Sequence, residues 1–174
     1  NGMMFTQGYE ACSLCSPSRA AIFTGKAPAR THLTQVVEND STARTLYKNY
    51  RARMCSGEAT GFLSPDEFTV GKALKKEGYK TCFLGKWHLG HDDPYFPDKH
   101  GFDVSLGHCY EYRIPHFGPW PEQVGFQDMA DDDYMPERLT DEALRFIDKQ
   151  ADTPFFLFLS HWVPHLPAEG RPEV

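Results

Sequence analysis

The sequence has no long hydrophobic run and no concentration of positive charge. Its longest apolar run covers only residues 155–159, whereas a membrane span needs roughly 20 apolar residues. Its 18 Lys and Arg residues are scattered along the chain, with Lys75 and Lys76 the one adjacent pair, and the net charge is -6. No basic stripe is therefore present to neutralise a nucleic-acid backbone. We expect neither a membrane span nor a nucleic-acid partner.

Cysteine is also sparse. The five cysteines are Cys12, Cys15, Cys55, Cys82 and Cys109. This odd set is spread too thinly for the disulfide framework of a small secreted domain. At least one of these cysteines must therefore do something other than form an internal disulfide.

What is present is the composition of a globular protein. The chain has 174 residues, of which 40% are hydrophobic and 14% aromatic, and a chain of this length can bury one sizeable core. The 13 prolines and 14 glycines are distributed as turn formers, and no repeat or low-complexity tract is visible. We expect residues 1–174 to form a single domain.

A helix is expected directly after Cys15. Ser16 can cap it, Pro17 suits the first helical position, and Gly25 can end it. Cys15 then stands at the helix N-terminus, where unpaired amide hydrogens and the helix dipole favour an anion. Arg19 follows one turn later, so its guanidinium can return to the same face and offer a planar fork to oxyanion oxygens.

Two further helix–strand pairs are expected. Thr69 can cap a helix over residues 70–77, which a strand over residues 79–84 follows. A second helix, residues 139–150, precedes residues 155–159, which predict a fully buried strand because they show no polar alternation. This order favours parallel strands joined by helical crossovers, hence an α/β sheet covered on both faces. The stretch 91–134 is assigned to long loops.

The carboxyl ends of parallel strands are where ligands bind in open α/β sheets. Lys86 and His88 lie just past the first expected strand, two residues apart, so in an extended segment both point to the same side. The second strand is followed by His161 and His165. The other interpretation is a solvated lysine and structural histidines, just as Cys15 and Arg19 could be a buried thiol and a surface cation.

Two motifs give these residues a family context. SLCSPSRAAIFTG, residues 13–25, resembles the sulfatase signature, and GYKTCFLGKWHLG, residues 78–90, resembles the second signature of that family. PFFLFLSHWVPHLP, residues 154–167, more loosely resembles the strand that delivers an active-site histidine, here His165. The resemblance implies part of an alkaline-phosphatase-like sandwich, with a mainly parallel sheet flanked by helices.

The resemblance also implies a chemistry. A formylglycine-generating enzyme would oxidise Cys15 to formylglycine, which would attack the sulfate ester of a small molecule or polysaccharide, with a sulfated sugar as the expected substrate. Arg19 belongs to the same motif, Lys86 would neutralise sulfate charge, and His88 would hydrogen-bond the formylglycine hydroxyls. His165 would contact the ester and protonate the leaving oxygen, with His161 at the substrate rim.

A calcium ion is implied as well, with residue 15, as formylglycine, among its ligands. Its other ligands belong to segments that we expect to lie outside this chain, because Asp92 and Asp93, like residues 131–133, follow no apolar strand and read as solvated loops. We therefore expect a fragment of the N-terminal catalytic domain of a sulfatase, without the first strand and the C-terminal part, which is inactive by itself. The resemblance to sulfatases implies a periplasmic or extracellular location.

Three other hypotheses stay open at this point. A phosphonate monoester or phosphodiester hydrolase of the same superfamily would carry the same motif, and a non-catalytic remnant would keep the fold without the chemistry. A thiol redox protein would use Cys12 and Cys15, which form a C-x-x-C without a second copy.

Four aromatic residues of the middle stretch could stack on a carbohydrate or aryl group: Tyr110, Tyr112, His116 and Trp120.

Overall fold

The computed structural model of the protein describes residues 2–37, 59–108, 115–166 and 169–171. The α-helices are α1 (Cys15–Thr24), α2 (Pro28–Thr31), α4 (Val70–Lys76) and α5 (Met135–Lys149). The strands are β1 (Lys80–Gly85), β2 (Val104–Leu106) and β3 (Phe155–Ser160), and two 3₁₀ turns, η1 (Pro97–His100) and η2 (Glu122–Val124), lie in the connections. No helix in this described part is long and apolar enough to cross a membrane.

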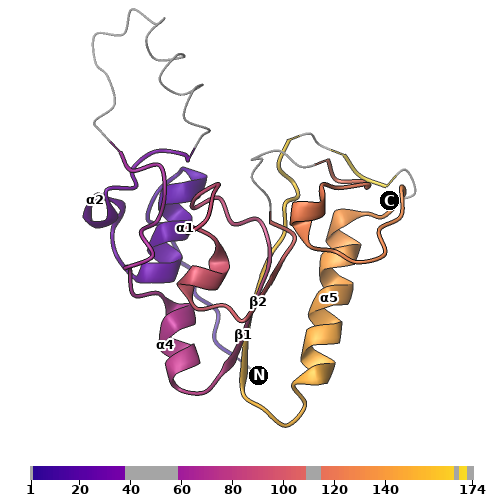
Figure 1. Ribbon diagram of the computed structural model, residues 1–174. Helices are drawn as coiled ribbons and strands as arrows, with labels where there is room; N and C mark the ends of the chain where they lie inside the picture. Colours follow the sequence, from indigo (N-terminus) through magenta and orange to yellow (C-terminus); the bar gives the residue numbers. More distant parts are fainter. Residues whose placement is uncertain (1, 38–58, 109–114, 167–168, 172–174) are drawn as a thin grey trace, which may run out of the picture.

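The three strands form a parallel sheet in the order β2-β1-β3. Figure 1 shows α1, α2 and α4 on one side of this sheet and α5 on the other. The expected α/β architecture, with parallel strands and helices on both faces, is confirmed. Because the strands are parallel, the chain leaves β1 and β3 at the same edge, and Gly85 pairs with Ser160 at the last rung of their ladder.

Each face of the sheet has its own core, because successive residues of β1 point to opposite sides. Cys82 and Leu84 pack with residues of α5. Phe83 packs instead with an aromatic cluster that includes Phe23 of α1, and their ring centres are 6.1 Å apart. With both faces covered, β1 reads as a continuous apolar run. This double burial fixes the position of the end of β1, where Lys86 follows.

The start of α1 differs from the expected one. The helix begins at Cys15, and Leu14 occupies the N-cap position without a side-chain hydrogen bond. The Ser16 hydroxyl does not cap the helix; it accepts a hydrogen bond from the Val37 backbone N–H at 3.0 Å. Pro17 is then the third helical residue. The first turn tolerates a proline because backbone N–H groups there have no intrahelical acceptor, so no hydrogen bond is lost. Gly25 ends the helix in a left-handed conformation, as expected.

The helix after Thr69 is confirmed, and its cap with it. The Thr69 hydroxyl accepts a hydrogen bond from Lys72 N–H at 3.3 Å and donates one to the His100 carbonyl at 2.5 Å. By contrast, α5 begins four residues before the expected start at residue 139, with Pro136 in its first turn. The hydrophobic periodicity of the sequence did not predict this first turn, because a proline at a helix start does not add to the apolar pattern.

Two predictions about strands were wrong. The stretch 91–134 contains β2, a strand too short to show periodicity, and residues 155–159 are not fully buried. Phe155 and Leu159 are each 38% exposed, because β3 lies at the edge of the described sheet. An uninterrupted apolar run shows that both faces are apolar, but it does not show which strand lies at the edge.

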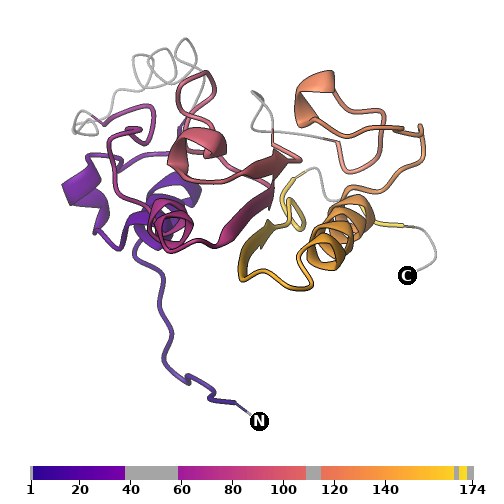
Figure 2. The same ribbon diagram turned by 60° about the horizontal axis from the view of Figure 1, so that its bottom comes forward.

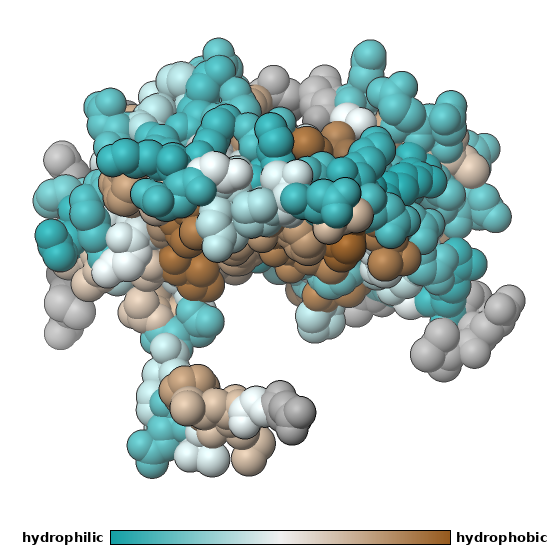
Figure 3. All heavy atoms as spheres, turned by 90° about the horizontal axis from the view of Figure 1, so that it is seen from below, coloured by the Kyte–Doolittle hydropathy of each residue, from teal (hydrophilic) through white to brown (hydrophobic). Residues whose placement is uncertain are grey.

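Apolar surface remains exposed near this edge. The start of the chain, before Glu10, runs away from the body of the molecule (Figure 2), and Met4 and Tyr9 in this segment are 84% and 88% exposed. Figure 3 shows hydrophobic residues on this segment and along the side of the body that faces it. Ile22 of α1 is likewise exposed. The β3 edge lacks the charges with which exposed sheet edges are usually protected.

A first prediction concerns Gly85. Its φ is +98°, and a Cβ there would lie 2.0 Å from the Ser160 carbonyl oxygen, so alanine would push β1 and β3 apart. We expect Gly85→Ala to lower the free energy of unfolding of the full-length protein by about 3 kcal/mol or more. The control is Gly78→Ala, where φ is +84° but the space is open, and we expect a cost of about 1 kcal/mol. If urea unfolding gave the same loss of unfolding free energy for both variants, this packing of Gly85 against Ser160 would be contradicted.

A second prediction concerns His100, which is fully buried against the Trp87 ring. Neither of its ring nitrogens has a hydrogen-bond partner among the described residues, and burial lowers the pKa of His100 from 6.5 to about 4. The unfolded chain therefore takes up the proton first, and stability falls as the pH drops from 6.5 towards about 4.

Through this residue we expect a loss of about 2 kcal/mol of unfolding free energy between pH 7 and pH 5. His100→Phe should show a correspondingly smaller loss, because phenylalanine takes up no proton. Urea unfolding of both proteins at the two pH values measures the difference. The same loss in both would mean that His100 is not the group that takes up the proton.

Candidate active site

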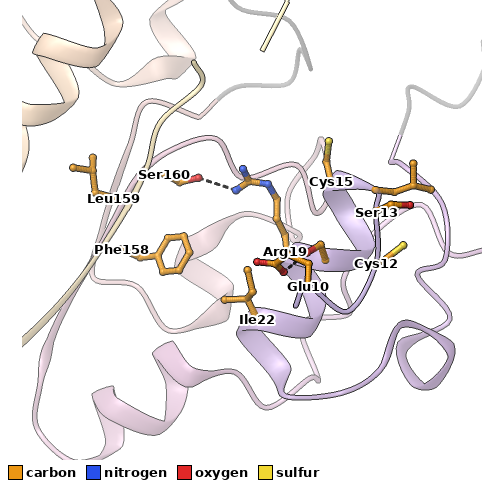
Figure 4. Close-up of a pocket in the computed structure, with 11 residues that line it drawn as sticks. Glu10, Cys12, Ser13, Cys15, Arg19, Ile22, Phe158, Leu159 and Ser160 are labelled. Carbon is orange, nitrogen blue, oxygen red and sulfur yellow. Dashed lines mark hydrogen bonds between the residues drawn. The ribbon is translucent and has the colours of Figure 1, made fainter. Parts of the chain in front are cut away.

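The first turn of α1 and the end of β3 border a hollow of about 560 Å³. Figure 4 shows Arg19 projecting from α1 towards Ser160 of β3, with Cys15 at the start of the same helix. Glu10 and Cys12, from the segment that precedes the helix, line the same hollow. The hollow therefore lies at the carboxyl edge of the sheet, where the sequence pattern predicted reactive groups.

Cys15 is the first residue of α1 and is half-buried. The dipole of a ten-residue helix places partial positive charge at this end. No acidic residue lies in the first turn of α1. The position of Cys15 therefore suits a side chain that carries or binds negative charge.

Arg19 connects α1 to the ends of β1 and β3. Its Nη1 donates hydrogen bonds to the Lys86 carbonyl at 2.6 Å and to the Ser160 hydroxyl oxygen at 2.7 Å. Burial lowers the pKa of Arg19, and negative charge at Cys15 acts in the opposite direction. One nitrogen of the guanidinium is thus used by the protein, so an anion would bind through Nη2 and Nε.

Lys86 is almost completely buried, with 3% of its surface exposed. Its ammonium nitrogen lies 5.4 Å from the centre of the Trp162 ring, a cation–π contact. No salt bridge joins Lys86 to a carboxylate within the described ranges. Burial lowers the pKa of Lys86, negative charge at Cys15 raises it, and the nearby Arg19 lowers it further. A buried cation in this situation needs an anionic partner.

His88 lies in the same electrostatic neighbourhood. It is 6% exposed, and burial followed by the charge of Lys86 lowers its pKa to about 3. Its Nε2 lies 2.9 Å from the Val37 carbonyl oxygen, which can only accept, so Nε2 carries the proton and Nδ1 the lone pair. The backbone at His88 has a positive φ of 59°, so the segment after β1 does not stay extended as expected. Such strain is frequent at functional sites.

The two later histidines occupy different surroundings. His165 is half-buried, and its described hydrogen bonds, to Leu166 and Trp162, stay within its own loop. His161 lines a second hollow of about 340 Å³ together with residues of the first turns of α5, such as Glu137 and Asp141. The structure therefore brings Cys15, Arg19, Lys86 and His88 together, while His161 faces another hollow.

Several other expectations concern residues around this site. Trp87 and Trp162 are buried core residues. His116 and Trp120 are also buried, at 2% and 4% exposure, so they are not open stacking surfaces. Tyr110 and Tyr112 lie outside the described residues, as do Cys55 and Cys109. Cys12, Cys15 and Cys82 are free thiols.

Sequence reasoning missed two polar residues of the hollow. Ser160 contacts Arg19 as described above, and its place at the end of an apolar strand is a signal that could have identified it. Glu10 accepts a hydrogen bond from the Ser18 hydroxyl at 2.5 Å. Nothing in the sequence pattern distinguishes Glu10 from a solvated acid, because it precedes the helix in an irregular segment.

A calcium site was implied only by the family resemblance. Among the residues whose positions the structure gives, no three His, Cys, Asp or Glu side chains form a group that could hold a metal ion. Calcium takes six to eight oxygen ligands, so these residues do not form such a site by themselves. The steps proposed below therefore involve only side chains of this chain.

Comparisons with known proteins agree with the motifs. The sulfatase family profile matches residues 1–173. N-acetylgalactosamine-6-sulfatase of Mus musculus is 33% identical over 184 residues, which cover 95% of this chain and 34% of the mouse protein. The chain thus spans about a third of the length of the curated relatives it matches.

Solved structures resemble this fold at lower identity. The crystal structure of Ps i-CgsB in complex with k-i-k-neocarrahexaose matches with a TM-score of 0.66 at 24% identity, over 95% of this chain and 38% of that chain. The PsFucS1 sulfatase from Pseudoalteromonas sp. matches with a TM-score of 0.58 at 22% identity, over 92% of this chain and 36% of that chain. These likenesses show the fold, which is that of the alkaline-phosphatase-like sulfatases. With the profile match over nearly every residue, they establish that this chain belongs to the sulfatase family.

Proposed function

We propose that the protein containing this chain hydrolyses sulfate esters through a formylglycine derived from Cys15, with a sulfated carbohydrate as its substrate. The observation that carries the proposal is the pair of cations beside Cys15 at a helix N-terminus, the buried Lys86 and the half-buried Arg19. The names of two matched proteins support the substrate class. One is an N-acetylgalactosamine-6-sulfatase, and the other was crystallised with an oligosaccharide.

The charges of the site suit a sulfate group better than a neutral ligand. A sulfate ester brings negative charge to Lys86, which the described residues leave without a carboxylate partner, and so offsets the cost of burying the ammonium group. The unused edge of Arg19 can donate to a second sulfate oxygen in a planar fork. Donors held in place in this way stabilise the charge that develops on the sulfate oxygens as the ester bond breaks.

In the first step, one hydroxyl of the hydrated aldehyde at position 15 attacks the sulfur. As that hydroxyl releases its proton, a bond forms between its oxygen and sulfur, and the bond between sulfur and the ester oxygen breaks. The ester oxygen takes up one proton, so the sugar leaves as an alcohol and the protons balance. His165, at the loop after β3, is our proposed donor of that proton. His161 lines a neighbouring hollow, and we assign it to the outer rim of the substrate site.

In the second step, the remaining hydroxyl at position 15 loses its proton, the carbonyl bond re-forms, and the bond between carbon and the sulfated oxygen breaks. Sulfate leaves and water rehydrates the aldehyde. We propose His88 Nδ1 as the proton acceptor. Burial lowers the pKa of His88 to about 3, so its imidazole is neutral near pH 7 and keeps a lone pair on Nδ1. A neutral imidazole with so low a pKa is a weak base, and the negative charge of a bound sulfate would raise its pKa and help it take up the proton.

Three partners follow from this chemistry. A formylglycine-generating enzyme would act on the segment around Cys15, and a sulfated sugar or polysaccharide would be the substrate. A calcium ion would take its further oxygen ligands from outside the described residues. Since the described residues do not form a metal site by themselves, we expect the isolated chain to be inactive. A periplasmic or extracellular location fits the sugar substrate.

The modification tests the proposal directly. The full-length protein is co-expressed with a formylglycine-generating enzyme, and the peptide that contains residue 15 is analysed by mass spectrometry. We expect the thiol of Cys15 to be replaced by an aldehyde, while Cys12 in the same peptide stays a thiol. Cys15→Ala should lower kcat by several orders of magnitude, because it removes the nucleophile.

Cys12→Ala is the matched control, because Cys12 lines the same hollow three residues earlier and should be dispensable. An unmodified Cys15 joined to Cys12 in a disulfide would refute the sulfatase mechanism and favour a thiol redox protein. Turnover of an aryl sulfate and an aryl phosphonate by the same preparation separates the two esterase classes. A strong preference for the phosphonate would overturn the choice of substrate.

A further inference from the structure

Ser160 stands where β1, β3 and α1 meet. It is the last residue of β3 and is 7% exposed. Its carbonyl accepts a hydrogen bond from Lys86 N–H at 2.8 Å, immediately after the ladder between the strands ends. Gly85 allows this close approach, because any Cβ there would overlap the Ser160 carbonyl. Ser160 is therefore fixed to the backbone on which Lys86 is carried.

The Ser160 side chain closes a ring of three hydrogen bonds. Arg19 Nη1 donates to the Ser160 hydroxyl oxygen at 2.7 Å and to the Lys86 carbonyl at 2.6 Å, and the Ser160 hydroxyl donates to the same carbonyl at 3.0 Å. Both hydrogens of Nη1, the single hydroxyl hydrogen and both lone pairs of the carbonyl are then used. A network with every member satisfied holds its groups in one arrangement.

This ring determines which edge of the guanidinium remains available. With Nη1 fixed on Ser160 and Lys86, only Nη2 and Nε of Arg19 can serve a ligand. Figure 4 shows the guanidinium between Ser160 on one side and Cys15 on the other. The guanidinium is thus anchored through Nη1. Its Nη2 and Nε remain available to a ligand bound beside residue 15, which would carry the nucleophile.

We propose that Ser160 is a positioning residue for the sulfatase reaction: its hydroxyl holds the Arg19 guanidinium and the Lys86 backbone in register with residue 15. The proposal rests on the proposed function. Ser160 touches neither the sulfate nor the nucleophile, and it acts through Arg19. Fixed donors contribute to catalysis because they need no reorganisation when charge develops.

Removal of the Ser160 hydroxyl should free the Arg19 guanidinium to move without unfolding the protein. In Ser160→Ala the Arg19 nitrogen loses one acceptor, while the backbone bonds between the strands remain. A hydrogen bond to a charged group is worth about 1.5–3 kcal/mol, so we expect kcat/KM towards an aryl sulfate to fall about 10- to 100-fold. Ser160→Thr keeps a hydroxyl and should stay within about threefold of the wild type.

The experiment uses the full-length, formylglycine-containing enzyme, with melting temperatures measured for each variant. The matched control is Ser105→Ala, because Ser105 is a β2 hydroxyl that bonds His108 at 3.2 Å, away from the ring. It should leave kcat/KM unchanged. The decisive variant pair combines Ser160→Ala with Arg19→Lys. If Ser160 acts through Arg19, its loss costs little once the guanidinium is gone.

Each outcome has one meaning. Wild-type activity in Ser160→Ala would overturn the positioning role while leaving the proposed function intact. Additive losses in the double variant, or an equal loss with a lowered melting temperature in Ser160→Thr, would show a structural role only and would also overturn it. A wild-type enzyme that hydrolyses no sulfate ester would overturn the proposed function and this role together.

Discussion

The site depends on one electrostatic constraint: two cations, the buried Lys86 and the half-buried Arg19 of α1, lie close together where β1 and β3 end. Burial lowers the pKa of both Lys86 and Arg19, and the charge of Arg19 lowers the pKa of Lys86 further. Such an arrangement is stable only if an anion, a helix terminus or a hydrogen-bond network offsets the charge. Here the network of Arg19, Ser160 and the Lys86 carbonyl supplies part of that compensation, and the proposed substrate supplies the rest.

The fold brings these groups together by ordinary means. Strand β1 is packed between two cores, so its end is fixed, and Gly85 lets β3 approach closely enough for Ser160 to reach Lys86. Helix α1 is held against the sheet by Phe23, whose ring contacts Phe83, Trp87 and Phe158. The rigid aromatic core therefore sets the distance between the helix that carries Cys15 and the strand end that carries Lys86.

The sequence predicted those parts of this arrangement that depend on local pattern. The Thr69 cap, the glycine stop at Gly25 and the parallel strands with helices on both faces all follow from short-range rules, and the structure has them. The order of residues also predicted that Arg19 would return to the side of Cys15. These features needed no knowledge of distant contacts.

What the sequence did not predict depends on tertiary contacts. Ser16 could have capped α1, but its hydroxyl binds Val37, 21 residues away. The edge position of β3 follows from strand order, which an apolar run does not encode. Ser160 looked like the polar end of a strand, and its role appears only when Arg19 and Lys86 are placed around it. The His88 ring likewise meets a distant group, the Val37 carbonyl 51 residues away, which local pattern does not encode.

The central claim is that an anion binds between Lys86, the free edge of Arg19 and residue 15. The most direct measurement is a crystal structure of the full-length protein with a sulfated sugar that it turns over slowly. The account predicts the sulfate group within hydrogen-bonding distance of Lys86 Nζ and against the side chain of residue 15. A sulfate group bound elsewhere, with Lys86 and Arg19 satisfied by protein groups alone, would contradict it.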